Sequence, residues 1–534
     1  MVISGRRPSL DCTGRPQLST VRPGAGRPRR APRRAHQRRR GAPRRALTRL
    51  ATNRAGRLWS PAGLPTLAVR TAPGRGRRPG RGAAVRARRG PSCPASEARR
   101  TPVSIDETIS PQLPGAVPVP SAWLNFRRLL PEEMPPPRDP EGVAALELAA
   151  RIRLGAIREQ ERSREPLLPV PEEVRERYAE MGRPTRLTRA VGLERHLGTP
   201  ARIYLKREDT LPTGSFKLNS AVAQAYFAAR EGVGTLVTET GAGQWGHAVQ
   251  WAARLYGLRS VVFWSGVSAR QKTARRAVLS MLGATVHESP SALTAAGRAV
   301  LASGRHAAGT LGTAIGDAVS YASEHPEVRY VSGSNLPHVL IHQSVIGLET
   351  SEQLAALGEE PDVLVAAVGG GSNLMGLMAP FLERKRARGA GLRLVGAESA
   401  AAPRLTRGTW RYDHADPGRL TPLSKSYTLG LDAELPETHV GGLRQHSGST
   451  AVGVLRSAGW LEAVAYEERE IFETGRLVLR LEGFLPAPES CHALRAAIEE
   501  AAAARRPTVI VACVSGHGLL DVEGYLDAFG PGHG

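Results

Sequence analysis

From residue 200 onward, short apolar runs alternate with longer amphipathic stretches. The apolar runs are rich in valine, leucine and isoleucine, which predicts buried β-strands at 203–205, 235–238, 260–264, 363–368, 392–396 and 508–513. The amphipathic stretches predict helices around 218–231, 246–256, 269–282, 374–388 and 490–504. This alternation predicts an α/β fold with parallel sheets covered on both faces, and it places ligands at the carboxyl ends of the strands.

The chain before residue 200 follows a different pattern. Helices are predicted around 141–163 and 171–181, and the second begins with Pro171-Glu172-Glu173, a favourable helix start. Residues 101–140 are rich in proline and are expected to lie extended over the surface.

Residues 1–100 differ from the rest in charge. They hold 27 arginines, no lysine and two acidic residues. Residues 101–534 hold the other 46 basic and 47 acidic residues, whose charges nearly cancel. An arginine-rich segment can bind nucleic acid or an anionic surface, and it is also typical of an organelle transit peptide. Because this segment lacks apolar periodicity, we favour a disordered or spurious extension over residues 1–115. We expect that residues 1–110 can be deleted without loss of folding or activity.

Neither a membrane span nor a metal site is expected from the sequence. No run of about 18 apolar residues occurs, which argues against a membrane-spanning helix. The cysteines Cys12, Cys93, Cys491 and Cys513 show neither a disulfide pattern nor metal-ligand spacing. A cytoplasmic protein without a nucleic-acid partner is therefore expected.

Lys217 is one of five lysines and lies in the turn 212–219, between a predicted strand and a predicted helix. Small neighbours allow a ligand to approach closely, and burial near a helix N-terminus favours the neutral, nucleophilic amine. The other four lie beside charged or polar residues: Lys206, Lys272, Lys385 and Lys425. Lys217 is therefore the candidate for a Schiff base with an aldehyde.

A second motif lies about 150 residues later in the chain. The apolar run 363–368 leads directly into Gly369-Gly370-Gly371-Ser372-Asn373 and then into a predicted helix. Backbone N–H groups and a helix N-terminus can converge there on a phosphate. A nucleophilic lysine and a phosphate cradle together indicate pyridoxal phosphate.

Two further segments follow predicted strands. Glu239 precedes the loop 240–246, where Gly241 and Gly243 allow backbone N–H groups to surround a carboxylate. An acid beside an anion pocket is electrostatically unfavourable, so Glu239 indicates acid–base chemistry. Ser515 follows the last strand and could hydrogen-bond the pyridine nitrogen. A neutral serine there favours elimination and replacement at the β-carbon over transamination.

These segments together resemble the β-subunit of tryptophan synthase, and in particular its second, divergent branch. The resemblance spans roughly residues 118–530 and includes Trp123-Leu124-Asn125, Gly182-Arg183-Pro184-Thr185, Leu405-Thr406-Arg407-Gly408, Tyr427-Thr428-Leu429-Gly430 and Pro486-Ala487-Pro488-Glu489-Ser490. It implies fold type II, in which residues 116–534 form two interleaved α/β subdomains with pyridoxal phosphate between them.

The resemblance also implies roles for the candidate residues. Lys217 would form the internal aldimine, and the cofactor would be bound by Asn219, Gly369, Gly370, Gly371, Ser372, Asn373, Glu482 and Ser515. The substrate carboxylate would be bound by Thr240, Gly241, Ala242, Gly243 and Gln244. Glu239 would help to expel the β-hydroxyl of serine, giving an aminoacrylate to which indole adds to form tryptophan. A homodimer is implied, whereas pairing with an α-subunit is less expected for this branch.

Departures from the family pattern leave alternatives open. Phe216 stands where the family usually has histidine, and the order Ser-Phe-Lys is similar to threonine dehydratases and threonine synthases. Gly430-Leu431-Asp432-Ala433 and Gln445 also differ from the branch, in the region expected to line the nucleophile pocket. A hydroxy-amino-acid dehydratase, an acceptor other than indole, and a cofactor-binding regulatory protein are the alternatives.

Overall fold

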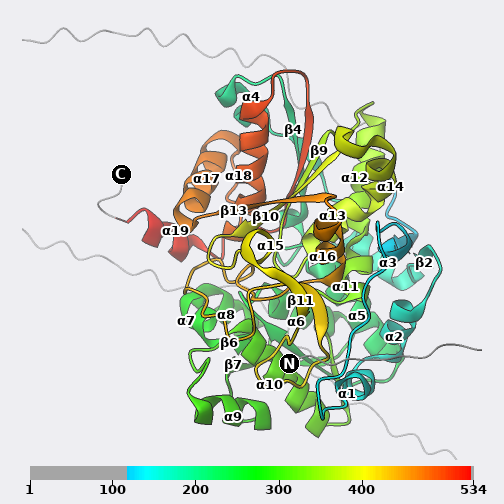
Figure 1. Cartoon of the computed structure of the whole chain (residues 1–534), viewed down its shortest axis with the longest axis vertical. Coiled ribbons are helices and arrows are strands. Elements are labelled where there is room, and N and C mark those ends of the chain that lie inside the picture. Colours follow the sequence, from blue (N-terminus) through cyan, green and yellow to red (C-terminus); the bar gives the residue numbers. More distant parts are fainter. Residues whose placement is uncertain (1–116, 531–534) are drawn as a thin grey trace, which may run out of the picture. The chain divides into compact units, whose positions relative to one another are not determined.

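The structure is a computed structural model that describes residues 117–530 (Figure 1). Residues 1–116 and 531–534 lie outside the described part, and with them the predicted extension, Cys12 and Cys93. The described residues all belong to one unit of the chain, residues 101–534. Their framework is a pair of sheets, one in the upper and one in the lower half of Figure 1.

The larger sheet has six strands in the order β13-β10-β9-β14-β4-β3. All neighbours are parallel except β3, which pairs antiparallel with β4. The strands span Leu187–Arg189 (β3), Arg202–Arg207 (β4), Val363–Ala367 (β9), Arg393–Ser399 (β10), Leu461–Tyr466 (β13) and Val509–Val514 (β14). Every residue of β9 and β14 is buried, as their continuous apolar sequences predict.

The smaller sheet is fully parallel, in the order β7-β6-β5-β8. Its strands span Thr235–Thr240 (β5), Arg259–Ser265 (β6), Thr285–Ser289 (β7) and Val328–Tyr330 (β8). Two antiparallel pairs complete the strands: β1 (Ala122–Leu124) with β2 (Leu167–Pro169), and β11 (Thr409–Asp413) with β12 (Ser424–Thr428).

Helices connect the strands and cover the sheets (Figure 1). They span Ala145–Ile152 (α1), Gly155–Arg162 (α2), Glu172–Glu180 (α3), Val191–Leu197 (α4), Leu218–Arg230 (α5), Gln244–Leu255 (α6), Gly266–Gln271 (α7), Thr273–Met281 (α8), Ala295–Ser303 (α9), Leu311–Glu324 (α10), Pro337–Gln343 (α11), Val345–Ala356 (α12), Ser372–Met378 (α13), Leu382–Arg388 (α14), Arg404–Arg407 (α15), Thr450–Ser457 (α16), Glu468–Glu482 (α17), Pro488–Ala503 (α18) and Val522–Ala528 (α19). Short 3₁₀ turns span Phe126–Arg128 (η1), Glu208–Thr210 (η2), Ala379–Phe381 (η3) and Gly389–Gly391 (η4).

Three predicted helices are interrupted in the structure. The helix predicted at 269–282 divides into α7 and α8 at Lys272, whose φ of −110° and ψ of 58° are not helical. The helix predicted at 374–388 divides at η3, where Pro380 lacks the N–H that a continuous helix needs. The helix predicted at 141–163 divides into α1 and α2 because Arg153 and Leu154 are extended.

The prediction that residues 101–140 lie extended over the surface is wrong for part of the described segment. Trp123 and Phe126 are fully buried in the main apolar core, and Trp123 belongs to β1. Burying two large aromatic rings removes much apolar surface from water, which anchors this segment to the fold.

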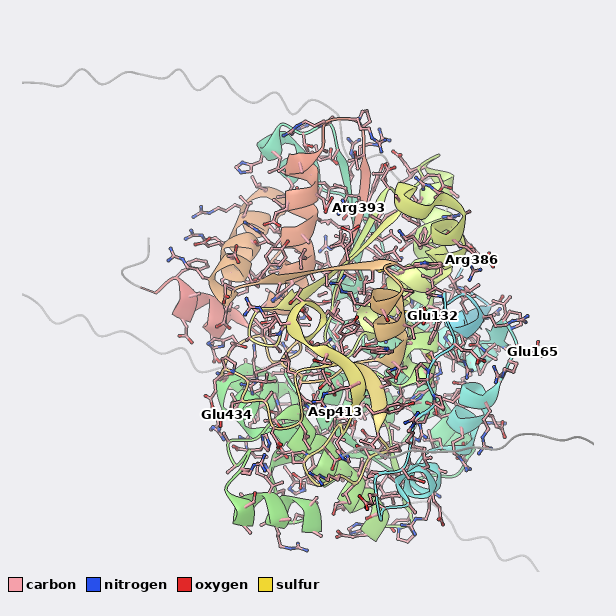
Figure 2. All side chains as sticks on the ribbon, viewed as in Figure 1. Glu132, Glu165, Arg386, Arg393, Asp413 and Glu434 are labelled. Carbon is pink, nitrogen blue, oxygen red and sulfur yellow. The ribbon has the colours of Figure 1, made fainter. Side chains whose placement is uncertain are left out.

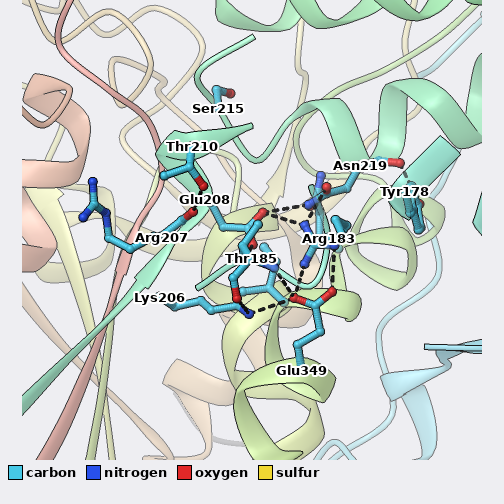
Figure 3. A network of polar contacts seen from close by, with 12 residues as sticks. Tyr178, Arg183, Thr185, Lys206, Arg207, Glu208, Thr210, Ser215, Asn219 and Glu349 are labelled. Carbon is cyan, nitrogen blue, oxygen red and sulfur yellow. Dashed lines mark hydrogen bonds and ion pairs between the residues drawn. The ribbon is translucent and has the colours of Figure 1, made fainter. Parts of the chain in front are cut away.

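Charged side chains lie mostly on the outside of the described part, as Glu132, Glu165 and Arg386 do in Figure 2. A buried exception is the network of Arg183, Lys206, Glu208 and Glu349, in which two acids neutralise two bases (Figure 3). No helix within residues 117–530 is both long enough and apolar enough to cross a membrane.

Candidate active site

Lys217 lies at the N-terminal end of α5, in a turn that its neighbours fix. Gly214 has a φ of +65°, and a Cβ there would come within 2.0 Å of the His517 ring, so the turn requires glycine. The Phe216 N–H donates to the Ser515 carbonyl at 3.1 Å, which ties the turn to the end of β14. The Lys217 ammonium lies 4.3 Å from the centre of the Phe216 ring.

The Lys217 amine faces a cavity between the two sheets. Burial lowers the pKa of Lys217 to about 8; the nearby Glu489 carboxylate opposes this shift and the Arg275 charge adds to it. The side chain is half-buried, because the cavity itself exposes part of it. A lysine with this pKa is still mostly protonated at neutral pH, but its neutral, nucleophilic form is far more populated than in an ordinary lysine.

The cavity collects most of the predicted site residues. From the sequence candidates, its lining includes Lys217, Glu239, Thr240, Gly241, Ala242, Gln244, Gly369, Gly370, Gly371, Ser372, Asn373 and Ser515. They come from the turn before α5 and from the carboxyl ends of β5, β9 and β14. Parallel strands direct their carboxyl ends to one edge, so the loops after β9 and β14 meet in the larger sheet, and the loop after β5 comes from the smaller sheet.

The glycine loop 369–371 lies between β9 and α13 and packs too closely for side chains. A Cβ on Gly369 would lie 2.4 Å from the Gly442 carbonyl, and one on Gly370 would lie 2.5 Å from the Ser334 Cβ. Gly371, with a φ of +112°, is the residue before α13. Within residues 117–530, the N–H groups of these three glycines donate no hydrogen bond. A glycine loop with free donors facing a cavity fits the phosphate of pyridoxal phosphate.

The loop after β5 shapes the opposite wall of the cavity. Gly243 does not line the cavity; its φ is +85°, and a Cβ there would come within 2.3 Å of the Trp264 ring. The Thr240 hydroxyl accepts the Gly246 N–H at 3.2 Å, which fixes the start of α6. Gly243 therefore supports the loop through its conformation, while its neighbours present their donors to the cavity.

Glu239 is the acid of this site and is 3% exposed. Burial raises its pKa to about 7, although the Tyr330 hydroxyl partly offsets the shift. One carboxylate oxygen, Oε2, is buried and has no hydrogen-bond partner within residues 117–530. A carboxyl group with a pKa near neutrality can donate a proton and take one back at physiological pH.

Glu239 also lines a second, larger cavity of about 500 Å³. The walls of this cavity are mainly apolar and include Met134, Leu146, Ala149, Ala150, Ile152, Ile315, Val319, Leu336, Leu340 and Leu420. Several arginines lie along it, of which Arg153 pairs with Glu161 at 2.8 Å. Glu239 is thus a lining residue of both cavities.

Ser515 lines the cavity at the end of β14, and its hydroxyl lies 2.8 Å from that of Ser490. Ser490 also accepts the Gly516 N–H at 3.0 Å, so the two serines form a fixed pair. No charged group is hydrogen-bonded to the Ser515 hydroxyl within residues 117–530. A neutral hydroxyl at this position fits a pyridine nitrogen that stays unprotonated.

Two of the predicted cofactor residues lie elsewhere. Glu482 ends α17, outside the cavity, and its carboxylate accepts the Leu193 N–H at 2.6 Å. Asn219 is fully buried in the ionic network, where it accepts from Arg183 at 2.8 Å and donates to Glu208 at 3.0 Å (Figure 3). The expectation that these two residues bind the cofactor is therefore corrected. The amide of Asn219 and the carboxylate of Glu482 instead make structural contacts.

A second acid that lines the cavity is Glu489, to which the sequence assigned no role. Its carboxylate accepts the Gly442 N–H at 2.9 Å and lies 3.5 Å from the Gln244 amide. The signal was present, since Glu489 follows a proline at the start of α18, where acids are favourable. Gln445, from the region that the resemblance expected near the nucleophile pocket, also lines the cavity, as do Ser334 and Leu311, whose local sequence gave no such indication.

Comparisons with known proteins identify the family of the chain. Residues 179–516 match the family described as pyridoxal-phosphate dependent enzyme. Tryptophan synthase beta chain 2 of Methanothermobacter thermautotrophicus is 45% identical over 412 residues, which are 77% of this chain and 96% of that protein. Tryptophan synthase beta chain of Pyrobaculum islandicum is 48% identical over 413 residues, 76% of this chain and 96% of that protein.

The solved structure of a threonine deaminase from T.th. is also similar, with a TM-score of 0.49 and 23% identity over 65% of this chain and 96% of that one. The matches to the family and to the beta chains confirm the predicted enzyme class, the α/β fold of the family and the pyridoxal phosphate cofactor. The chain belongs to the tryptophan synthase beta chain family of pyridoxal-phosphate dependent enzymes.

Proposed function

We propose that this protein replaces the β-hydroxyl of serine with indole, giving tryptophan and water. The observation that carries the proposal is the position of Glu239, which lines both the Lys217 cavity and the apolar cavity. A β-replacement needs a proton donor at the place where one group leaves and another arrives. The names of the relatives, tryptophan synthase beta chains, support the same reaction.

Pyridoxal phosphate, when bound to the amino acid, draws electrons from the α-carbon and so permits loss of a group from the β-carbon. The phosphate would be held by the loop from Gly369 to Asn373, and Ser515 would hydrogen-bond the pyridine nitrogen. The substrate carboxylate would meet the N–H groups of residues 240–244. Lys217, whose pKa burial lowers to about 8, would in its neutral form accept the α-proton at its Nζ atom.

Glu239 would act twice in this reaction. In its protonated form it donates a proton to the β-hydroxyl, which then leaves as water. In its carboxylate form it would orient the N–H of indole and accept a proton, since Glu239 also lines the apolar cavity. The pKa of about 7 makes both forms available near neutral pH. The atoms balance: serine and indole give tryptophan and one water.

The larger cavity supports an apolar aromatic acceptor. Its aliphatic walls would bury a ring without charge, and burial of apolar surface is the main favourable contribution for such a ligand. Phe216 supports a second candidate function, that of a hydroxy-amino-acid dehydratase, because its apolar ring lies directly against Lys217. In a dehydratase the larger cavity would have no part in the reaction.

Filling the larger cavity tests the proposal. Ala150 lines it from α1, so Ala150→Trp should raise the KM for indole by about tenfold or more, because the indole ring and the new side chain compete for the same space. Loss of water from serine alone should change little. The measurements are tryptophan formation at varied indole and product formation from serine without indole.

A matched control lies on the same helix. Glu147 is exposed and does not line the cavity, so Glu147→Trp should leave the KM for indole unchanged. Equal KM values for indole in Ala150→Trp and in the unchanged protein would mean that the acceptor does not use this cavity.

The resemblance also supports proposals about assembly, location and extent. We propose a homodimer in the cytoplasm that acts on its small-molecule substrates without requiring an α-subunit. We further propose that the catalytic region begins near residue 116 and that the preceding residues are dispensable.

A further inference from the structure

Arg404 is a buried arginine that has no acidic partner among the described residues. It begins α15 and is 1% exposed. Its guanidinium forms no ion pair within residues 117–530, and its Nη1 atom is buried without a hydrogen-bond partner there. Glu398 is the acid whose charge acts on Arg404, but its carboxylate accepts hydrogen bonds from the Leu405 and Thr406 N–H groups, each at 2.9 Å. A buried charge without a partner is strongly unfavourable, so another anion is expected to compensate it.

The guanidinium lies behind the glycine loop. Its Nη2 atom donates to the Val368 carbonyl at 3.3 Å and also to the Gly369 carbonyl. A Cβ on Gly448 would come within 2.8 Å of the Arg404 Nε atom, so the side chain is enclosed on its other side. Arg404 is therefore held in one place against the start of the loop.

This contact fixes the direction of two N–H groups. In a planar trans peptide the C=O and N–H bonds point in opposite directions. Because the carbonyls of Val368 and Gly369 point to Arg404, the N–H groups of Gly369 and Gly370 point away from it. Both glycines line the Lys217 cavity, and neither N–H donates a hydrogen bond within residues 117–530.

The charges that line the cavity do not themselves balance a phosphate. Among the described residues they are Lys217, Glu239 and Glu489, of which only the lysine is a cation. A phosphate monoester carries close to two negative charges at neutral pH. The guanidinium that touches the glycine loop from outside the cavity is Arg404.

We propose that Arg404 is a positioning residue for the cofactor phosphate: it turns the loop N–H groups toward the phosphate and provides a positive charge behind them. This inference rests on the proposal that the glycine loop holds the phosphate. The phosphate in turn is the anion that compensates the buried guanidinium.

The test compares two ligands that differ only in the phosphate, pyridoxal phosphate and pyridoxal. Their dissociation constants are measured by absorbance on the full-length protein freed of cofactor. The dissociation constant of pyridoxal divided by that of pyridoxal phosphate gives the contribution of the phosphate. Arg404→Gln keeps N–H donors for the carbonyls but removes the charge, whereas Arg404→Lys keeps the charge. We expect Arg404→Gln to reduce the ratio by about tenfold or more and Arg404→Lys to retain most of it.

The remaining outcomes separate the alternatives. A purely structural role would weaken both ligands equally in Arg404→Gln, and the unchanged ratio would overturn the inference. If the unchanged protein bound both ligands equally well, the glycine loop would not hold the phosphate, and the proposed site itself would fail.

A measurement on the unchanged protein needs no variant. We expect the ³¹P resonance of the bound cofactor to stay constant between about pH 5 and 7, where a free phosphate monoester titrates. A resonance that shifts over this range would contradict a positive charge behind the loop, even if Arg404→Gln did not fold.

Discussion

Replacing Lys217 by alanine is expected to remove the visible absorbance band of the bound cofactor and to lower turnover by at least about 10³-fold. Lys217 is the lysine that lines the cavity, and burial has lowered its pKa to about 8, so its amine is the nucleophile that the cofactor aldehyde meets. Absorbance spectra of the purified variant with added pyridoxal phosphate, together with tryptophan formation, measure both effects.

Lys425→Ala is the matched control for this prediction. Lys425 lies in β12 with its amine 5.2 Å from the centre of the Trp410 ring, and it does not line the cavity. The control should keep the absorbance band and the turnover. A band that persists in Lys217→Ala would show that another lysine carries the cofactor.

Replacing Glu239 by glutamine is expected to keep the absorbance band but to slow the loss of water from serine by about 10²-fold or more. The amide has nearly the same shape as the carboxyl group, yet it cannot donate a proton to the leaving hydroxyl. Loss of water requires protonated Glu239, so kcat/KM for serine should fall as the pH rises through about 7. The glutamine variant should lack this pH dependence, which stopped-flow measurements at several pH values would reveal.

Glu482→Gln serves as the control, because this carboxylate contacts the backbone of Leu193 and lies outside the cavity. It should leave the pH dependence intact. An unchanged rate and pH profile in Glu239→Gln would remove Glu239 from the reaction.

The loops of the site could be predicted because each follows from a local pattern. The turn at Lys217, the glycine loop 369–371 and the loop after Glu239 all join a strand to a helix, and small residues mark each junction. Within each sheet, the parallel order of the strands brings such loops to one edge. The loop after β5 belongs to the other sheet, and its approach to the glycine loop depends on long-range packing.

Local sequence patterns could not predict which acid, Glu482 or Glu489, lines the cavity. The two acids lie seven positions apart in sequence, but one ends α17 and the other begins α18. Which of them faces the cavity depends on how α18 packs against the large sheet. Asn219 is similar, since its partners Arg183 and Glu208 come from other elements and the sequence near Lys217 does not indicate them.

A single-turnover reaction tests β-replacement most directly. The purified protein with bound cofactor is mixed first with serine and then with indole, and tryptophan and pyruvate are counted by chromatography. We predict one tryptophan for each bound cofactor, formed only after indole is added, with little pyruvate. Pyruvate formed at the same rate with and without indole, and no tryptophan, would contradict β-replacement and identify a dehydratase.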